Sequence, residues 1–61
     1  MYRHIYKHVD GRKFLIEPRT GGTLFVVMLS SDGMVLKHGI YKSFAKAIEL
    51  ICDDVGWEQT H

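Results

Sequence analysis

The residue types that could do chemistry in this 61-residue chain are four histidines, one cysteine and a group of C-terminal carboxylates. His4 and His8 lie four residues apart in a segment that alternates in polarity, which predicts a strand. Four residues of strand span about 13 Å, too far for two ligands of one zinc ion at about 2 Å each. His38 or a second copy would have to complete such a site. We therefore expect no metal, and interpret these histidines as exposed strand residues.

Cys52 is the only cysteine, so the chain has no internal disulfide and lacks the second thiolate of a sulfur-based zinc site. Its position beside the apolar stripe of a predicted helix favours a half-buried small side chain over a nucleophile. Asp53, Asp54 and Glu58 lack the spaced oxygen ligands and central glycine of a calcium loop. We interpret them as a solvated acidic helix end, with an interaction patch as the alternative. No glycine pattern of a phosphate loop is present, and we predict neither an enzyme nor a cofactor.

Basic residues are concentrated in the first two thirds of the chain. Residues 1–42 hold seven Lys or Arg against three Asp or Glu, whereas residues 43–61 hold one against four, and the net charge is only +1. A basic sheet with tyrosines can bind nucleic acid, which is our alternative function. Its expected residues are Arg3, Lys7, Arg12, Lys13, Arg19 and Lys37, with Tyr2 and Tyr6 for base stacking. The acids offset nearly all of this charge, whereas duplex binders usually show a clear basic excess.

Length and composition predict one small folded domain over residues 1–61. The hydrophobic fraction is 46% with a single proline, typical of a folded chain. A chain of this size buries only about 60% of its unfolded surface, and with no disulfide to help, self-association is the common remaining route to stability. No apolar run approaches the roughly 18 residues of a membrane span, and no signal peptide is recognisable. We expect no membrane partner and a cytoplasmic location.

The stretch that organises the sequence is 23–30, Thr-Leu-Phe-Val-Val-Met-Leu-Ser, which predicts a central strand. Both of its faces are apolar, so it needs cover on two sides. Before it, residues 2–9 predict a strand, and Asp10-Gly11 is typical of a two-residue hairpin turn. Such a turn pairs Val9 with Arg12. It places Ile5, Phe14 and Ile16 on one face, the expected core, and Tyr6 and Leu15 on the other.

The second half of the chain predicts one more strand and a helix. Residues 34–41 form the fourth strand after a turn at 30–33, and pairing across that turn favours Phe25, Val27 and Leu29 as the helix-facing side of the central strand. Ser43 is a suitable N-cap, apolar spacing from Phe44 to Val55 is helical, and Gly56 is a suitable C-cap. The predicted fold is therefore α+β: an antiparallel four-stranded sheet with one C-terminal helix packed on one face.

One helix cannot cover both faces of such a sheet, and uncovered apolar patches mark interfaces. We therefore expect a small non-enzymatic protein-interaction module that forms a homodimer and binds another protein. It would act as a regulator, inhibitor or adaptor, of the kind that compact genomes such as those of phages encode. The expected interface consists of Leu15, Leu24, Val26, Met28, Val35 and Trp57. A three-stranded sheet followed by a helix also occurs in the arm-binding domains of phage integrases, which this order of elements resembles in topology alone.

Overall fold

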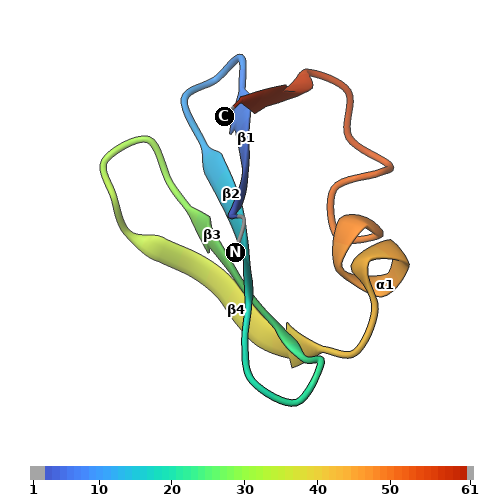
Figure 1. Ribbon diagram of the computed structural model, residues 1–61. Coiled ribbons are helices and arrows are strands. Elements are labelled where there is room, and N and C mark those ends of the chain that lie inside the picture. The colour runs from blue at the N-terminus through green and yellow to red at the C-terminus, as the bar shows by residue number, and fades with distance from the viewer. Residues whose placement is uncertain (1–2, 61) are drawn as a thin grey trace.

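The fold is an antiparallel sheet of five strands with one short helix against one of its faces (Figure 1). The computed structural model describes residues 3–60. Its elements are β1 (His4–His8), β2 (Lys13–Pro18), β3 (Leu24–Leu29), β4 (Val35–Tyr41), α1 (Phe44–Ile48) and β5 (Trp57–Thr60). The strand order is β4-β3-β2-β1-β5, so β3 and β2 are internal and β4 and β5 form the edges. The predicted antiparallel sheet with one helix is confirmed, but the strand count was wrong.

Each hairpin turn is a three-residue loop closed by glycine. His8 N–H donates to Arg12 C=O at 2.9 Å around the loop 9–11, and Ser30 N–H donates to Met34 C=O at 2.8 Å around the loop 31–33. Gly11 and Gly33, the last residues of these loops, have φ of +102° and +92°. This is the three-residue hairpin in which glycine at positive φ forms a bulge and lets the strands continue in register.

The three-residue loop overturns the predicted register of the first hairpin. Tyr6 pairs with Phe14, and Ile5 pairs with Leu15, one residue away from the pairing that a two-residue Asp10-Gly11 turn would give. Side chains alternate between the two faces of a sheet. A shift of one residue in the pairing therefore exchanges the β1 side chains that share a face with Phe14 and Ile16. Ile5 therefore leaves the expected core, and Tyr6 joins Phe14 there.

The second predicted face assignment was also wrong. In β3 the side chains that face the helical segment belong to Val26 and Met28, which are 1% and 8% exposed. Phe25 and Val27, expected to face the helix, lie on the opposite side, beside Leu15 and away from the buried cluster. Both sets of β3 side chains are apolar enough to form a core, so hydrophobicity does not distinguish the two faces.

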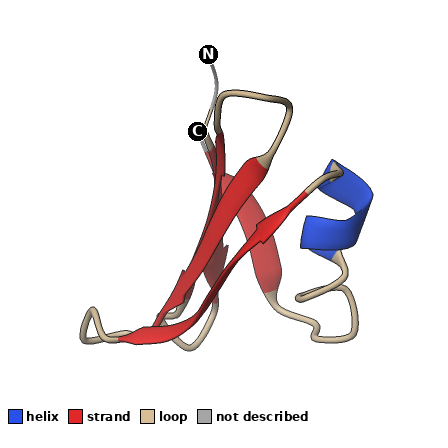
Figure 2. Cartoon of the chain, turned by 90° about the horizontal axis from the view of Figure 1, so that it is seen from below, coloured by secondary structure: helices blue, strands red, loops and turns tan. Residues whose placement is uncertain are grey.

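The core lies between the covered face of the sheet and residues 44–51 (Figure 2). Its buried side chains come from β2, β3 and the helical segment: Phe14, Ile16, Val26, Met28, Ala47 and Ile51. Partly buried side chains surround them: Tyr6, Leu24, Tyr41, Ile48, Leu50 and Trp57. The five-residue helix α1 is far too short to be stable alone, so it forms because Ala47 packs on this core.

The C-terminal segment differs most from the prediction. Ser43 caps α1 as expected, accepting a hydrogen bond from Lys46 N–H at 3.2 Å, but the helix ends at Ile48 and is followed by turns. Gly56 is not a helix cap. It has φ of +101° and leads into β5, where an added Cβ would lie 3.0 Å from His8 Nε2. The chain then runs antiparallel to β1, which brings Trp57 opposite His8.

The turns make a direct stability prediction. Gly11→Ala should lower the free energy of unfolding by about 2–3 kcal/mol, since strained positive-φ backbone costs about 1–3 kcal/mol for a residue with a side chain. In addition, the new Cβ would lie 2.8 Å from Ser31 Cβ in the neighbouring turn. Gly21→Ala is the matched control, because Gly21 also has positive φ, +85°, but nothing lies within 4 Å of an added Cβ. Chemical denaturation compares the two, and equal losses would contradict the contact between the turns.

Candidate functional site

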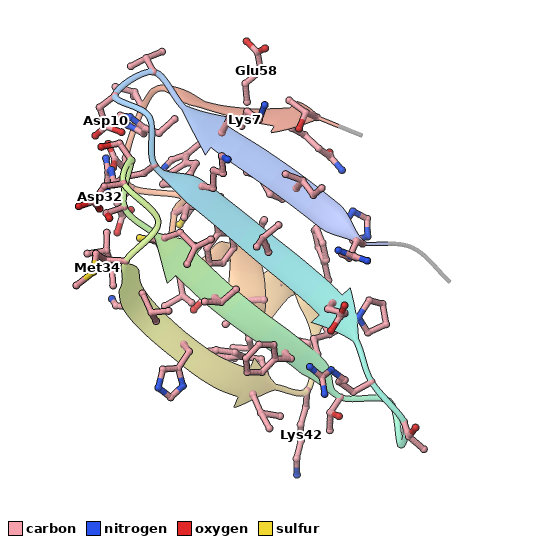
Figure 3. All side chains as sticks on the ribbon, turned by 90° about the vertical axis from the view of Figure 1, so that its left-hand side faces the viewer. Lys7, Asp10, Asp32, Met34, Lys42 and Glu58 are labelled. Atoms are coloured by element: carbon pink, nitrogen blue, oxygen red, sulfur yellow. The ribbon has the colours of Figure 1, made fainter. Side chains whose placement is uncertain are left out.

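The side of the sheet opposite the helix carries an uncovered apolar surface, which we call the open face. The strand register places its apolar side chains on one side of the sheet: Ile5, Leu15, Phe25, Val27, Leu29, Val35 and Ile40. Figure 3 views the sheet from this side, with the helical segment behind it. No element formed by residues 3–60 covers this face. The open face is therefore the main apolar surface that the described chain leaves available.

Exposure increases across the open face toward the β4 edge. Leu15 and Val27, on the internal strands β2 and β3, are half-buried by their neighbours, whereas Val35 and Ile40 are 57% and 68% exposed. A shallow hollow lies over β2 and β3, lined by Arg3, Leu15, Glu17, Phe25 and Val27. Its floor is apolar and its rim is charged, an arrangement suited to an apolar side chain of a partner protein.

Charged side chains surround this apolar centre. Glu17 is contacted by two guanidinium groups, with Arg3 Nε at 3.6 Å and Arg19 Nη2 at 3.1 Å from its carboxylate oxygens. The guanidinium carbon of Arg19 also lies 4.8 Å from the centre of the Phe25 ring. These contacts hold the cations at the edge of the hollow, with Arg3 and Arg19 still more than half exposed.

A second group of charges lies at the other end of the same face. Lys7 pairs directly with Lys13 across β1 and β2, and with Glu58 across β1 and β5. Lys7 and Glu58 stand together at that edge in Figure 3. With Arg3 and Arg19, cations therefore outnumber carboxylates around the open face.

The structure divides the predicted interface residues between two faces. Leu15 and Val35 lie on the open face. Val26 and Met28 are core residues and Leu24 packs against the core, so the expectation that they lie on an uncovered face was wrong. The strand register places the even-numbered side chains of β3 on the face that the helical segment covers. Trp57 is not free either: its ring packs against His8 and Phe14 at centroid distances of 4.9 and 6.2 Å.

The predicted nucleic-acid residues are also divided. Arg3, Lys7, Lys13 and Arg19 lie around the open face. Lys37 pairs with Met28 and so belongs to the covered side. Tyr6 packs on Phe14 with ring centroids 6.3 Å apart, and burial raises its pKa, so it offers no stacking platform. Tyr2 lies outside the described residues.

Arg12, the remaining basic candidate, is engaged in a polar cluster at the end of the first hairpin. Its Nε donates to Asp10 Oδ2 and its Nη2 donates to Asp54 Oδ2, both at 2.8 Å. Its guanidinium carbon lies 5.3 Å from the centre of the Trp57 ring. Arg12 thus joins the first turn to the chain before β5, and its role is structural.

His8 completes this cluster from inside. Its side chain is only 9% exposed, with Nε2 donating to the Val55 carbonyl at 2.8 Å and Nδ1 accepting from Asp10 N–H at 3.1 Å. The tautomer with its proton on Nε2 satisfies both bonds. His8 was predicted to be exposed, which is wrong, and the sequence did not predict the cluster. Only the position of β5 beside β1 brings Asp54 and Val55 to His8.

The cluster shifts the pKa values of its carboxyl groups. The hydrogen bond from the Arg12 side chain is the main cause of the lowered pKa of Asp54, and the Arg12 backbone N–H is the main cause for Asp10. The same contact with Asp54 raises the pKa of Arg12.

Within residues 3–60 no three His, Cys, Asp or Glu side chains are placed to hold a metal ion. Cys52, expected to be half-buried, is exposed.

No protein-family model matches this chain, and no curated protein or solved structure matches it. Among the described residues no helix is long and apolar enough to cross a membrane.

The polar cluster predicts how stability depends on pH. A carboxyl group whose pKa is lower in the folded state stabilises the fold above its unfolded pKa, about 3.9 for Asp. That contribution is lost as the pH falls through the lower folded pKa. Asp54→Asn should therefore lower the melting temperature at pH 7, and the difference from the unmodified protein should shrink toward pH 2, as followed by circular dichroism. Asp53→Asn is the control, because no ion pair to Asp53 is present among the described residues. Equal effects of the two substitutions would contradict the role of Asp54.

Proposed function

We propose that this protein binds another protein through the open face of its sheet, as a regulator, inhibitor or adaptor without catalytic activity of its own. The observation that supports this most is the apolar centre of the open face, which no part of the described chain covers. Apolar surface gains about 25 cal/mol for each Å² removed from water, so a face of this composition favours being covered. Contiguous exposed apolar surface on a small protein is typical of an interaction site.

The rim of the open face indicates the chemistry of the partner. Arg3, Arg19, Lys7 and Lys13 outnumber Glu17 and Glu58 there. A matching surface would have an apolar centre and an acidic border, since complementary charge steers association and excludes wrong partners. A second copy does not meet this requirement, because two open faces placed together would bring two cationic rims into contact. The favoured occupant is therefore a different protein with an acidic surface.

The proposal predicts a contact specific to the open face. A photoreactive phenylalanine analogue at Val27, introduced in the cells that make the protein, should cross-link one acidic protein. The same analogue at Val55 is the control, because Val55 is 89% exposed and lies beside His8, away from the open face. Once the cross-linked protein is purified, Val27→Asp should weaken its binding at least tenfold, about 1.4 kcal/mol. Identical products from both positions, or unchanged affinity of Val27→Asp, would overturn the proposal.

Nucleic-acid binding is the second candidate, and the pair formed by Lys7 and Lys13 supports it. These like charges face each other directly across two strands, an unfavourable arrangement that an anionic ligand would relieve. Phosphate contacts make affinity fall steeply with salt.

If this candidate is correct, the protein should shift the fluorescence anisotropy of labelled single-stranded or duplex DNA at low salt. Binding should weaken as salt rises, and Lys7→Ala with Lys13→Ala should reduce the salt dependence by about two phosphate contacts. Lys46→Ala on α1 is the control. Absence of binding at low salt would exclude this candidate without affecting the first.

A further inference from the structure

We propose that two copies of this chain associate by pairing their β4 strands antiparallel about a twofold axis, which joins two sheets into one of ten strands. This interface lies along the β4 edge, where Ile40 of the open face borders it, and it leaves the centre of the open face over β2 and β3 uncovered. It rests on the proposed function in one respect: it places two binding faces on the same side of the dimer. The expectation of a homodimer thereby gains a specific geometry.

The first observation is that β4 is an open edge. It is the outermost strand of the sheet, and at seven residues it is the longest strand. All but two of its residues are exposed, and no other strand formed by residues 3–60 pairs with its outer side. An edge strand presents a row of unpaired N–H and C=O groups that another strand can complete. The opposite edge, β5, has only four residues and offers a much shorter row.

The second observation is that β4 lacks most of the devices that protect edge strands. Such strands are usually short, charged, interrupted by proline or distorted by a bulge. β4 has no proline and a single charged residue, Lys37. The one register shift in β4, a β-bulge or similar irregularity, lies opposite Met28 and Leu29. From Lys37 to Tyr41 the pairing with β3 is regular. Leu36 and Ile40 are 53% and 68% exposed along this edge, which makes it apolar as well as open.

The third observation is the distribution of charge at the two ends of β4. Asp32 stands in the turn before the strand and Lys42 directly follows it, at opposite ends in Figure 3. Antiparallel pairing centred on His38, the middle residue of the strand, sets Leu36 of one copy opposite Ile40 of the other. It also brings each Lys42 to the end of the second copy that carries Asp32. Parallel pairing would instead place like charges together. The charges at the two ends of β4 are therefore complementary only in the antiparallel arrangement.

The occupant to which these observations point is a second copy rather than an unrelated strand. Opposite charges at the two ends, with Leu36 facing Ile40 between them, suit antiparallel self-pairing, and Lys37 is the one charged residue within the strand. A single pair of strands buries less surface than a standard interface of about 1,600 Å², so the dimer should be weak, with a dissociation constant in roughly the micromolar range. Two open faces in one dimer would raise affinity for a partner that has two sites.

Charge exchange tests this arrangement. Lys42→Asp would oppose Asp32 of the second copy with a like charge, and Asp32→Lys would oppose Lys42, so each should weaken the dimer severalfold in sedimentation equilibrium. The double variant restores opposite charges and should recover most of the affinity. Lys46→Asp on the exposed surface of α1 makes the same charge change away from the edge and should have little effect. Circular dichroism confirms that each variant is folded.

Several outcomes would overturn the proposal. These are a wild-type protein that remains monomeric at high micromolar concentration, a Lys42→Asp effect no larger than that of Lys46→Asp, or a double variant that fails to recover. The edge and the open face can be separated, because Val27→Asp should leave the dimer intact. Conversely, Lys42→Asp should leave cross-linking from Val27 intact. Loss of the dimer in Val27→Asp alone would instead indicate face-to-face association.

Discussion

A sheet has two faces, and the elements formed by residues 3–60 cover only one of them. Among these residues the segment between β4 and β5 supplies the cover, and its Ala47 and Ile51 reach the core. Everything else follows from which face this segment occupies. The covered face becomes a core of aromatic and aliphatic side chains, and the other face keeps apolar residues that no element of the described chain covers.

The covering segment is held in place mainly at its C-terminal end, where it leads into β5. A five-residue helix contributes little stability of its own. After it, the chain is fixed by β5 pairing with β1 and by the contacts of Arg12 with Asp54 and of His8 with Val55. Trp57 then closes the side of the core, although its buried indole Nε1 has no hydrogen-bond partner among the described residues. An unsatisfied buried group costs about 1–3 kcal/mol, and the packing of the Trp57 ring against His8 and Phe14 opposes that cost.

The sequence predicted the existence of the first four strands and the N-cap at Ser43, because alternation, turn residues and capping are local signals. It did not predict which face of the sheet each side chain occupies, because this depends on whether each hairpin turn has two or three residues. Asp10-Gly11 suits a two-residue turn, but it also suits the last two positions of a three-residue loop, where only Gly11 needs positive φ. Ser31-Asp32-Gly33 repeats that pattern. The two turn types differ by one residue of register, enough to exchange the core and the surface of β1.

The fifth strand was missed because residues 57–60 were interpreted as the chain beyond a helix. Trp57 and Thr60 are residue types that favour strands, and Gly56 before them is a turn signal, but four residues are too few to establish alternation. The polar cluster was missed for a different reason. Its members come from both ends of the chain, and no spacing in the sequence relates His8 to Asp54, so their meeting is a property of the fold alone.

Uncovered apolar surface and marginal size together favour association with other molecules. A domain of about 60 residues buries too little surface to be far from unfolding, so binding that stabilises only the folded state adds directly to its stability. The two available surfaces differ in chemistry. β4 is self-complementary in backbone and in end charges, whereas the open face carries a cationic rim that a second copy would repel. The proposed self-association at the edge would leave the centre of the open face over β2 and β3 uncovered, so the proposed dimer interface and partner site need not compete.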